Sequence, residues 1–250
     1  MPTFIGIDLA WQSDKNHSGA AVLHGDRRGV EVQEFSSDLT RLSDVKTFIY
    51  RNTRAETVVA IDAPLIVKNT CGQRPCETEI GRRFGAADAA AHTTNLKRYP
   101  GGGVQLARSL KSRGFLQCPQ PRTSRVNGKW FFEVYPHPAH VVLLRLAKII
   151  KYKKGSVASR RCGLAEFRQG LRQHLASGEP PLRSNAKLRA FLDQNLDELR
   201  GQALKHYEDK LDALFCAYLA AYFWVWGYER NEMIGDLDSG YIINPKAPAG

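Results

Sequence analysis

Hydrophobic residues along this chain fall into short continuous runs near its start and into helically spaced positions further on. Three strands are expected in succession, separated by polar turns. The first run is almost entirely apolar, which predicts a strand buried on both faces. We expect these strands over Phe4–Trp11, Gly19–His24 and Val30–Phe35, paired as an antiparallel meander.

A helix and a further buried strand are predicted next. Apolar residues recur at helical spacing from Asp38 to Asn52, and a second nearly continuous apolar run, Thr57–Asp62, is stopped by Ala63 and Pro64. A helix between two buried strands is typical of a parallel crossover, so this strand should lie beside the first.

The remainder predicts one aromatic strand, several helices and an irregular insertion. Residues 68–128 are rich in Arg, Gly, Pro and Thr, and we interpret them as an inserted cap within a single domain spanning residues 1–250. Helices are expected over Gly81–Ala91, Val104–Arg113, Ala139–Ile150, Leu164–Leu175, Leu188–Gln194 and Glu208–Tyr228, with strands over Trp130–Tyr135 and Gly240–Ile243.

Composition indicates a folded α/β protein with a basic surface. Of 250 residues, 43% are hydrophobic, which excludes wholesale disorder, and no apolar run is long enough for a membrane span. Lys and Arg outnumber Asp and Glu by 36 to 25, a net charge of +11, which favours a polyanionic partner such as nucleic acid over simple solubility.

Cysteine usage indicates a reducing environment. The five cysteines are scattered and odd in number, and no secretory leader is expected, so we predict a cytoplasmic protein with free thiols. Cys71 and Cys76 have no second pair at zinc-binding spacing, so they do not predict a zinc site.

Four carboxylates lie inside apolar elements, where an isolated charge costs several kcal/mol. Asp8 and Asp62 end buried strands, and each could instead cap the following turn. Glu133 lies within an aromatic strand and could instead face solvent at an edge. Asp212 lies in the most apolar helix, with Asp209 one turn earlier as a possible substitute. A shared Mg²⁺ or Mn²⁺ would neutralise all four, because these ions prefer oxygen ligands.

The element order, with acids after the first and fourth strands and on a late helix, is the ribonuclease-H-like layout of a mixed sheet flanked by helices. Five short motifs make the comparison more specific: Gly6-Ile7-Asp8-Leu9-Ala10-Trp11, Ala60-Ile61-Asp62-Ala63-Pro64-Leu65, Arg74-Pro75-Cys76-Glu77, Glu133-Val134-Tyr135-Pro136-His137-Pro138 and Asp209-Lys210-Leu211-Asp212-Ala213-Leu214. Together they resemble the domain of unknown function 429 family, whose members are predicted nucleases of the ribonuclease-H-like fold. The resemblance implies that Asp8, Asp62, Glu133 and Asp212 are its acidic positions, and that Arg74, Cys76, Glu77, Tyr135, Pro136 and His137 also line the site.

These residues suggest a metal-dependent phosphodiester hydrolase. Two metal ions would clamp the attacking water and the leaving oxygen, with Asp8 bridging them. His137 would relay a proton or contact phosphate, unless it is a structural histidine. Arg74, Glu77 and Tyr135 would contact substrate, as would the basic turn of Lys151, Lys153 and Lys154, whose Tyr152 is available to stack on a base.

The sequence leaves three other interpretations open. An actin-like ATP-dependent phosphotransferase would need a Gly-rich turn after Asp8, where the sequence has Leu9, Ala10 and Trp11. A non-catalytic nucleic-acid-binding module would bind with a steep salt dependence but would not cleave. In a purely structural arrangement, the acids would bond to neighbouring arginines without any metal.

Overall fold

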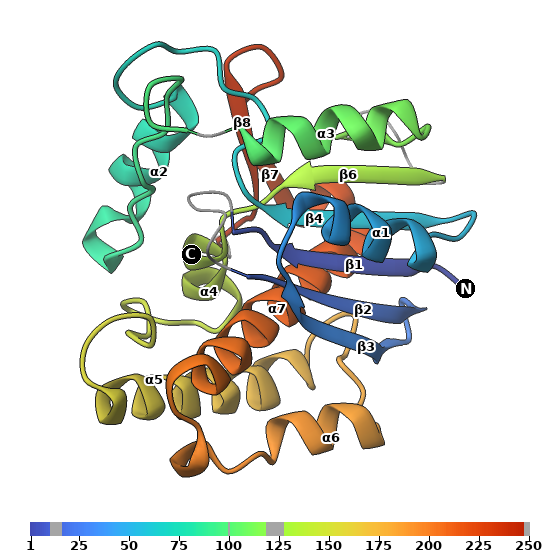
Figure 1. The fold of residues 1–250 in the computed structure, drawn as a ribbon, viewed down its shortest axis with the longest axis vertical. Coiled ribbons are helices and arrows are strands. Elements are labelled where there is room, and N and C mark those ends of the chain that lie inside the picture. The colour runs from blue at the N-terminus through green and yellow to red at the C-terminus, as the bar shows by residue number, and fades with distance from the viewer. Residues whose placement is uncertain (11–16, 100, 119–127, 248–250) are drawn as a thin grey trace.

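The computed structural model describes residues 1–10, 17–99, 101–118 and 128–247, which form an α/β structure around a six-stranded mixed sheet (Figure 1). The strand order is β3-β2-β1-β4-β6-β5, in which the first three strands are antiparallel and the others join in parallel. This confirms the predicted fold class and agrees with a ribonuclease-H-like arrangement. The strands of this sheet are β1 (Thr3–Asp8), β2 (Ser18–Asp26), β3 (Gly29–Leu39), β4 (Thr57–Asp62), β5 (Leu116–Gln117) and β6 (Lys129–Glu133).

Helices cover both faces of the sheet (Figure 1). On one face, α1 (Leu42–Asn52) and α3 (Gly102–Ser112) pack on alternate strand residues that include Ile5 and Ile7. On the other face, α7 (Gly201–Arg230) packs on the intervening residues, such as Phe4 and Ala21. Further helical elements are α2 (Pro75–Phe84), η1 (Gly85–Ala87), α4 (Pro136–Leu143), α5 (Val157–Gly170), η2 (Leu171–Leu175), α6 (Ala186–Leu192) and η3 (Leu196–Glu198).

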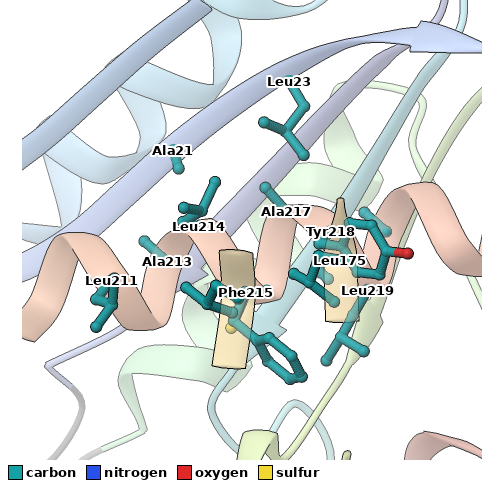
Figure 2. Close-up of a cluster of buried hydrophobic side chains, with 14 of the residues drawn as sticks. Ala21, Leu23, Leu175, Leu211, Ala213, Leu214, Phe215, Ala217, Tyr218 and Leu219 are labelled. Carbon is teal, nitrogen blue, oxygen red and sulfur yellow. The ribbon is translucent and has the colours of Figure 1, made fainter. Parts of the chain in front are cut away.

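Helix α7 lies unusually close to the central strand. A Cβ atom added at Gly6 would come within 2.1 Å of the backbone of both Ala213 and Ala217, so only glycine permits this approach. Figure 2 shows Ala213, Leu214 and Ala217 of α7 against Ala21 and Leu23 of the sheet, and all of them are buried. The contact therefore fixes the position of α7 against β1.

A small two-stranded sheet lies beside α2. Strands β7 (Asn231–Asp236) and β8 (Gly240–Pro245) form an antiparallel hairpin. Ile234 and Ile242 of the hairpin pack with Cys76 and Ile80 of α2 in a separate buried cluster. This cluster holds α2 near the carboxyl ends of the central strands.

Several predicted element boundaries were wrong. The first helix begins at Leu42 rather than Asp38, because β3 continues to Leu39, and α4 begins at Pro136 and ends at Leu143. Helix α7 begins seven residues before the predicted Glu208, and non-helical Gly227 interrupts it near its end. Strand β7 was not predicted, and Trp11, at the predicted end of the first strand, lies outside the described residues.

The predicted cap is partly integrated into the main layers. Within residues 68–128, α3 buries Leu106, Ala107 and Leu110 against the sheet and β5 pairs with β6, whereas α2 lies over the strand ends. The single-domain boundary and the role of this region as a cap stay predictions. Among the described residues, no helix combines the length and apolar character required to cross a membrane.

Candidate functional site

Two strand-end carboxylates lie directly side by side. The parallel register of β1 and β4 pairs Asp8 with Asp62. Both side chains share the sheet face of Phe4 and Val58, which is the face that α7 covers. The sheet therefore directs both carboxylates towards the helix.

Helix α7 contributes a third carboxylate, Asp212, which is fully buried. The Tyr152 hydroxyl donates a 2.6 Å hydrogen bond to Asp212 Oδ1, and Lys153 Nζ lies 3.0 Å from Oδ2. Apart from this ion pair, Oδ2 accepts no hydrogen bond within the described part of the chain. One turn earlier, Asp209 forms a 2.7 Å ion pair with Lys205 through Oδ1.

Burial and neighbouring charges shift the pKa values of Asp8 and Asp62. Burial raises the pKa of Asp8 to about 7, and repulsion from Asp212 and Asp209 adds to this against the attraction of Lys153. Burial, and then the charge of Asp8, raises the pKa of Asp62 well above its usual value. Full ionisation of all three carboxyl groups would therefore place more negative charge here than the single ammonium of Lys153 offsets.

Glu133 does not join this group. The register pairs Glu133 with Ile61 rather than Asp62, so its side chain points to the opposite face of the sheet. There Arg74 donates to both of its carboxylate oxygens, at 2.6 and 3.0 Å, and the backbone N–H of Leu65 donates a third hydrogen bond at 2.8 Å. Neutralisation by a guanidinium was the structural alternative for the acids, and the structure shows it for Glu133.

Arg74 and Glu77 are structural partners in this arrangement rather than free substrate contacts. Arg74 is 1% exposed and also donates to Glu77 Oε1 at 2.8 Å and to the carbonyl of Ile66 at 3.0 Å. Glu77 accepts further hydrogen bonds from the backbone N–H groups of Arg74 and Thr94, which caps α2. These contacts anchor α2 to the carboxyl ends of β4 and β6.

Tyr135 and His137 border the same pocket. The Tyr135 hydroxyl donates to the carbonyl of Ala90 at 3.0 Å and is joined to His137 Nδ1 by a 2.9 Å hydrogen bond. Burial, with a smaller contribution from Lys153, lowers the pKa of His137 to about 4. The imidazole is therefore neutral at pH 7, which favours a hydrogen-bonding role over proton relay.

The basic turn divides into residues with different surroundings. Lys153 enters the pocket, Lys151 lies 3.4 Å from Asp88, and Lys154 is exposed. Tyr152 is 1% exposed and holds Asp212, so the expectation that it stacks on a base is wrong. The sequence identified this basic turn but not its direct contact with the carboxylate on α7.

Together these elements enclose a pocket of about 200 Å³ at the carboxyl ends of β1, β4 and β6. The lining also includes His92 and Thr94. It comprises Asp8, Asp62, Ala63, Pro64, Arg74, Glu77, Ala91, His92, Thr94, Glu133, Val134, Tyr135, Pro136, His137, Lys153 and Ile242.

Sequence reasoning missed His140 altogether. Its ring is fully buried between Phe167 and Phe215, with centroids 4.4 and 4.3 Å away, and neither ring nitrogen has a hydrogen-bond partner among the residues described. Burial lowers its pKa well below the usual value. The spacing of His137 and His140 on one helix was the available signal.

The carboxylate oxygens of this acidic cluster are of the kind that bind Mg²⁺ or Mn²⁺ in proteins. Asp8, Asp62 and Asp212 offer carboxylate oxygens, and buried Asp212 Oδ2 is ion-paired with Lys153 but accepts no hydrogen bond in the described ranges. The arrangement is not that of an assembled metal centre, because no group of three or more His, Cys, Asp or Glu side chains in the described ranges is positioned to hold an ion. The ammonium of Lys153 lies beside the third donor instead.

Fold and pocket define an α/β protein with an acidic cluster at the carboxyl ends of its central strands. The chain belongs to the family described as Protein of unknown function (DUF429), which it matches over residues 6–231. This confirms the family resemblance found in the sequence. No curated protein matches the chain.

Proposed function

We propose that the protein is a Mg²⁺- or Mn²⁺-dependent phosphodiester hydrolase that acts on nucleic acid in this pocket. The supporting observation is the placement of Asp8 directly beside Asp62, with Asp212 facing them from α7. Asp8 and Asp62, whose pKa values are raised by burial and by neighbouring acidic groups, would be stabilised in their ionised form by a divalent cation.

Each residue then has a distinct role. Bound Mg²⁺ or Mn²⁺ would activate a water and stabilise charge on a phosphate oxygen. Asp8 and Asp62 would hold the ion, Asp212 would complete its ligands, and Tyr152 would keep Asp212 in position through its 2.6 Å hydrogen bond. Lys153 would donate to a phosphate oxygen once the ion takes over the neutralisation of Asp212.

Glu133 has a positioning role in this proposal. Its two oxygens are already occupied by Arg74 and the Leu65 backbone, so it orients the segment following β4 rather than binding the ion. This changes the assignment suggested by the sequence, in which Glu133 was a fourth ligand.

Nucleic acid is the proposed substrate because the chain carries a net charge of +11 and the pocket contains an ammonium. All five cysteines are free thiols, which is typical of a reducing compartment. A cytoplasmic location therefore stays a prediction.

A cleavage panel tests the proposal. Single- and double-stranded DNA and RNA would be incubated with wild type, Asp62→Asn or Asp197→Asn in the presence of Mg²⁺, Mn²⁺ or EDTA. Asp197→Asn is the control, because the Asp197 side chain is 89% exposed. We expect metal-dependent cleavage by wild type and Asp197→Asn, reduced at least roughly a hundredfold in Asp62→Asn. Equal cleavage by wild type and Asp62→Asn, or none with any substrate, would refute the proposal.

One observation favours a second candidate, a non-catalytic nucleic-acid-binding module. The 3.0 Å contact between Lys153 and Asp212 already neutralises one acid without metal. This candidate predicts binding that is unaffected by Mg²⁺ and by Asp62→Asn, with no product in any reaction of the panel.

A further inference from the structure

A second cluster of donor atoms lies outside the carboxylate pocket. It comprises His17, which directly precedes β2, and Gln202 and His206, one turn apart at the start of α7. His17 Nδ1 lies 3.2 Å from His206 Nε2, and Gln202 Nε2 lies 3.3 Å from His206 Nε2 and 3.5 Å from His17 Nδ1. The three atoms form a nearly equilateral triangle.

Hydrogen bonding alone does not satisfy this triangle. In a neutral imidazole each ring nitrogen is either a donor or an acceptor. If one histidine donates to the other, the Gln202 N–H group faces one acceptor and one competing N–H. At most two of the three contacts are therefore hydrogen bonds at any one time, whereas a cation inside the triangle would accept lone pairs from all three groups.

The distances agree with shared coordination of a metal ion. Two ligands at about 2.0–2.1 Å from a tetrahedral ion lie about 3.3–3.4 Å from each other, and the three observed separations of 3.2, 3.3 and 3.5 Å bracket this range. The two imidazole centroids are 5.2 Å apart and the ring planes are inclined by 29°. A flip of the Gln202 amide exchanges its nitrogen for its oxygen at the same position, so that a carbonyl oxygen becomes the third ligand.

We propose that His17, His206 and Gln202 form a binding site for a divalent transition-metal ion of the zinc class. Imidazole nitrogens select zinc, nickel or copper over magnesium, so the site would differ in metal preference from the carboxylate pocket. Its third donor is an amide, so the site is not a cluster of His, Cys, Asp and Glu side chains alone. A bound ion would connect the start of β2 with the start of α7.

Asp38, at the end of β3, supplies negative charge near this site. Its hydrogen bond from the Ser36 hydroxyl lowers its pKa, and both His206 and His17 contribute to the same shift. An adjacent carboxylate stabilises a bound cation. Asp38 is exposed, which leaves it free to reorient towards the ion.

Calorimetric titration with Zn²⁺ alone tests the proposal, with Co²⁺ absorption as a second measurement. The variants are His206→Phe, which keeps a ring against His17 but removes its nitrogens, and His174→Phe as a matched control elsewhere. Each is also prepared with Asp62→Asn, so that zinc held by the carboxylate pocket is recognised separately.

We expect one zinc ion per chain in Asp62→Asn and in His174→Phe with Asp62→Asn, and at least this one ion in wild type. In His206→Phe with Asp62→Asn the affinity should fall at least roughly a hundredfold, because loss of even a supporting partner of a ligand costs about 10–100-fold. Tetrahedral Co²⁺ absorption should disappear in parallel. Absence of zinc binding in Asp62→Asn, or equal affinity with and without His206, would overturn the proposal.

Discussion

Asp8 shows how burial and neighbouring charge act on a single residue. Its pKa of about 7 in the folded protein lies above the ordinary value of 3.8, chiefly because burial disfavours the carboxylate. The folded state therefore binds this proton more tightly than the unfolded state. The stability contributed by Asp8 is fully present below about pH 4 and is lost as the pH rises through 7.

Asp8→Asn should thus stabilise the metal-free protein at alkaline pH. In EDTA at pH 8, we expect a gain of about 1–3 kcal/mol over wild type, which shrinks towards zero near pH 4. Urea unfolding at intervals from pH 4 to 8 measures it. Asp197→Asn is the control and should unfold like wild type at every pH. If the difference in unfolding free energy between Asp8→Asn and wild type does not change with pH, ionisation of the buried Asp8 carboxyl is not the cause of that difference.

Arg74 is the residue whose removal should cost most stability near the pocket. Arg74→Met leaves the buried carboxylates of Glu77 and Glu133 without their common cation, which should destabilise the protein by about 3–5 kcal/mol. Chemical denaturation measures the change. Arg82→Met, which breaks an exposed ion pair with Glu79, is the control and should leave the unfolding midpoint unchanged. If both variants lost a similar amount of stability, burial would not explain the importance of the Arg74 ion pairs.

At the scale of elements, the contact of α7 with β1 determines where Asp212 lies. Gly6→Ala inserts a methyl group against the backbone of Ala213 and Ala217 and should force the helix away from the strand, at about 3 kcal/mol or more. Gly81→Ala in α2, where nothing lies within 4 Å of the added group, should instead stabilise slightly. Thermal unfolding compares the two variants. An unfolding temperature of Gly6→Ala equal to or above that of wild type would show that the close approach does not fix the helix.

Elements with a strong local pattern were predictable from the sequence. Strand β4 occurs over the predicted Thr57–Asp62, because its β-branched run ends at Ala63 and Pro64, which cannot continue the ladder. Strand β7 was missed, since Asn231 to Asp236 is mostly polar and its pairing depends on the distant β8. Local patterns reveal buried strands better than short polar hairpins.

The same distinction applies to the site. Asp8, Asp62 and Asp212 were identifiable because each is an acid within an apolar element. The pairing of Glu133 with Arg74 was not, because it depends on the β4–β6 register and joins residues 59 positions apart. Contacts between Tyr152, Lys153 and Asp212 likewise arise only when α7 packs beside the basic turn.

At the scale of the whole molecule, the positive charge should make nucleic-acid binding strongly salt-dependent. Exposed Lys154 lies one residue from Lys153 in the pocket, so Lys154→Gln should reduce the log–log salt slope by about 1 without altering Mn²⁺ binding. Fluorescence anisotropy between low and moderate salt measures the slope. Lys111→Gln, near the end of α3, is the control. If both variants reduced the salt slope equally, the effect would reflect the overall positive charge and not a contact near the pocket.

Binding of Mn²⁺, followed by calorimetry and by electron paramagnetic resonance at pH 8, tests most directly whether the clustered carboxylates are a cation site. Wild type and Asp197→Asn should bind Mn²⁺ with Mg²⁺ as a competitor, whereas Asp8→Asn and Asp62→Asn should each lose at least about tenfold in affinity. If wild type takes up no Mn²⁺, or if both pocket variants bind it as tightly as wild type, the carboxylates do not hold a metal ion.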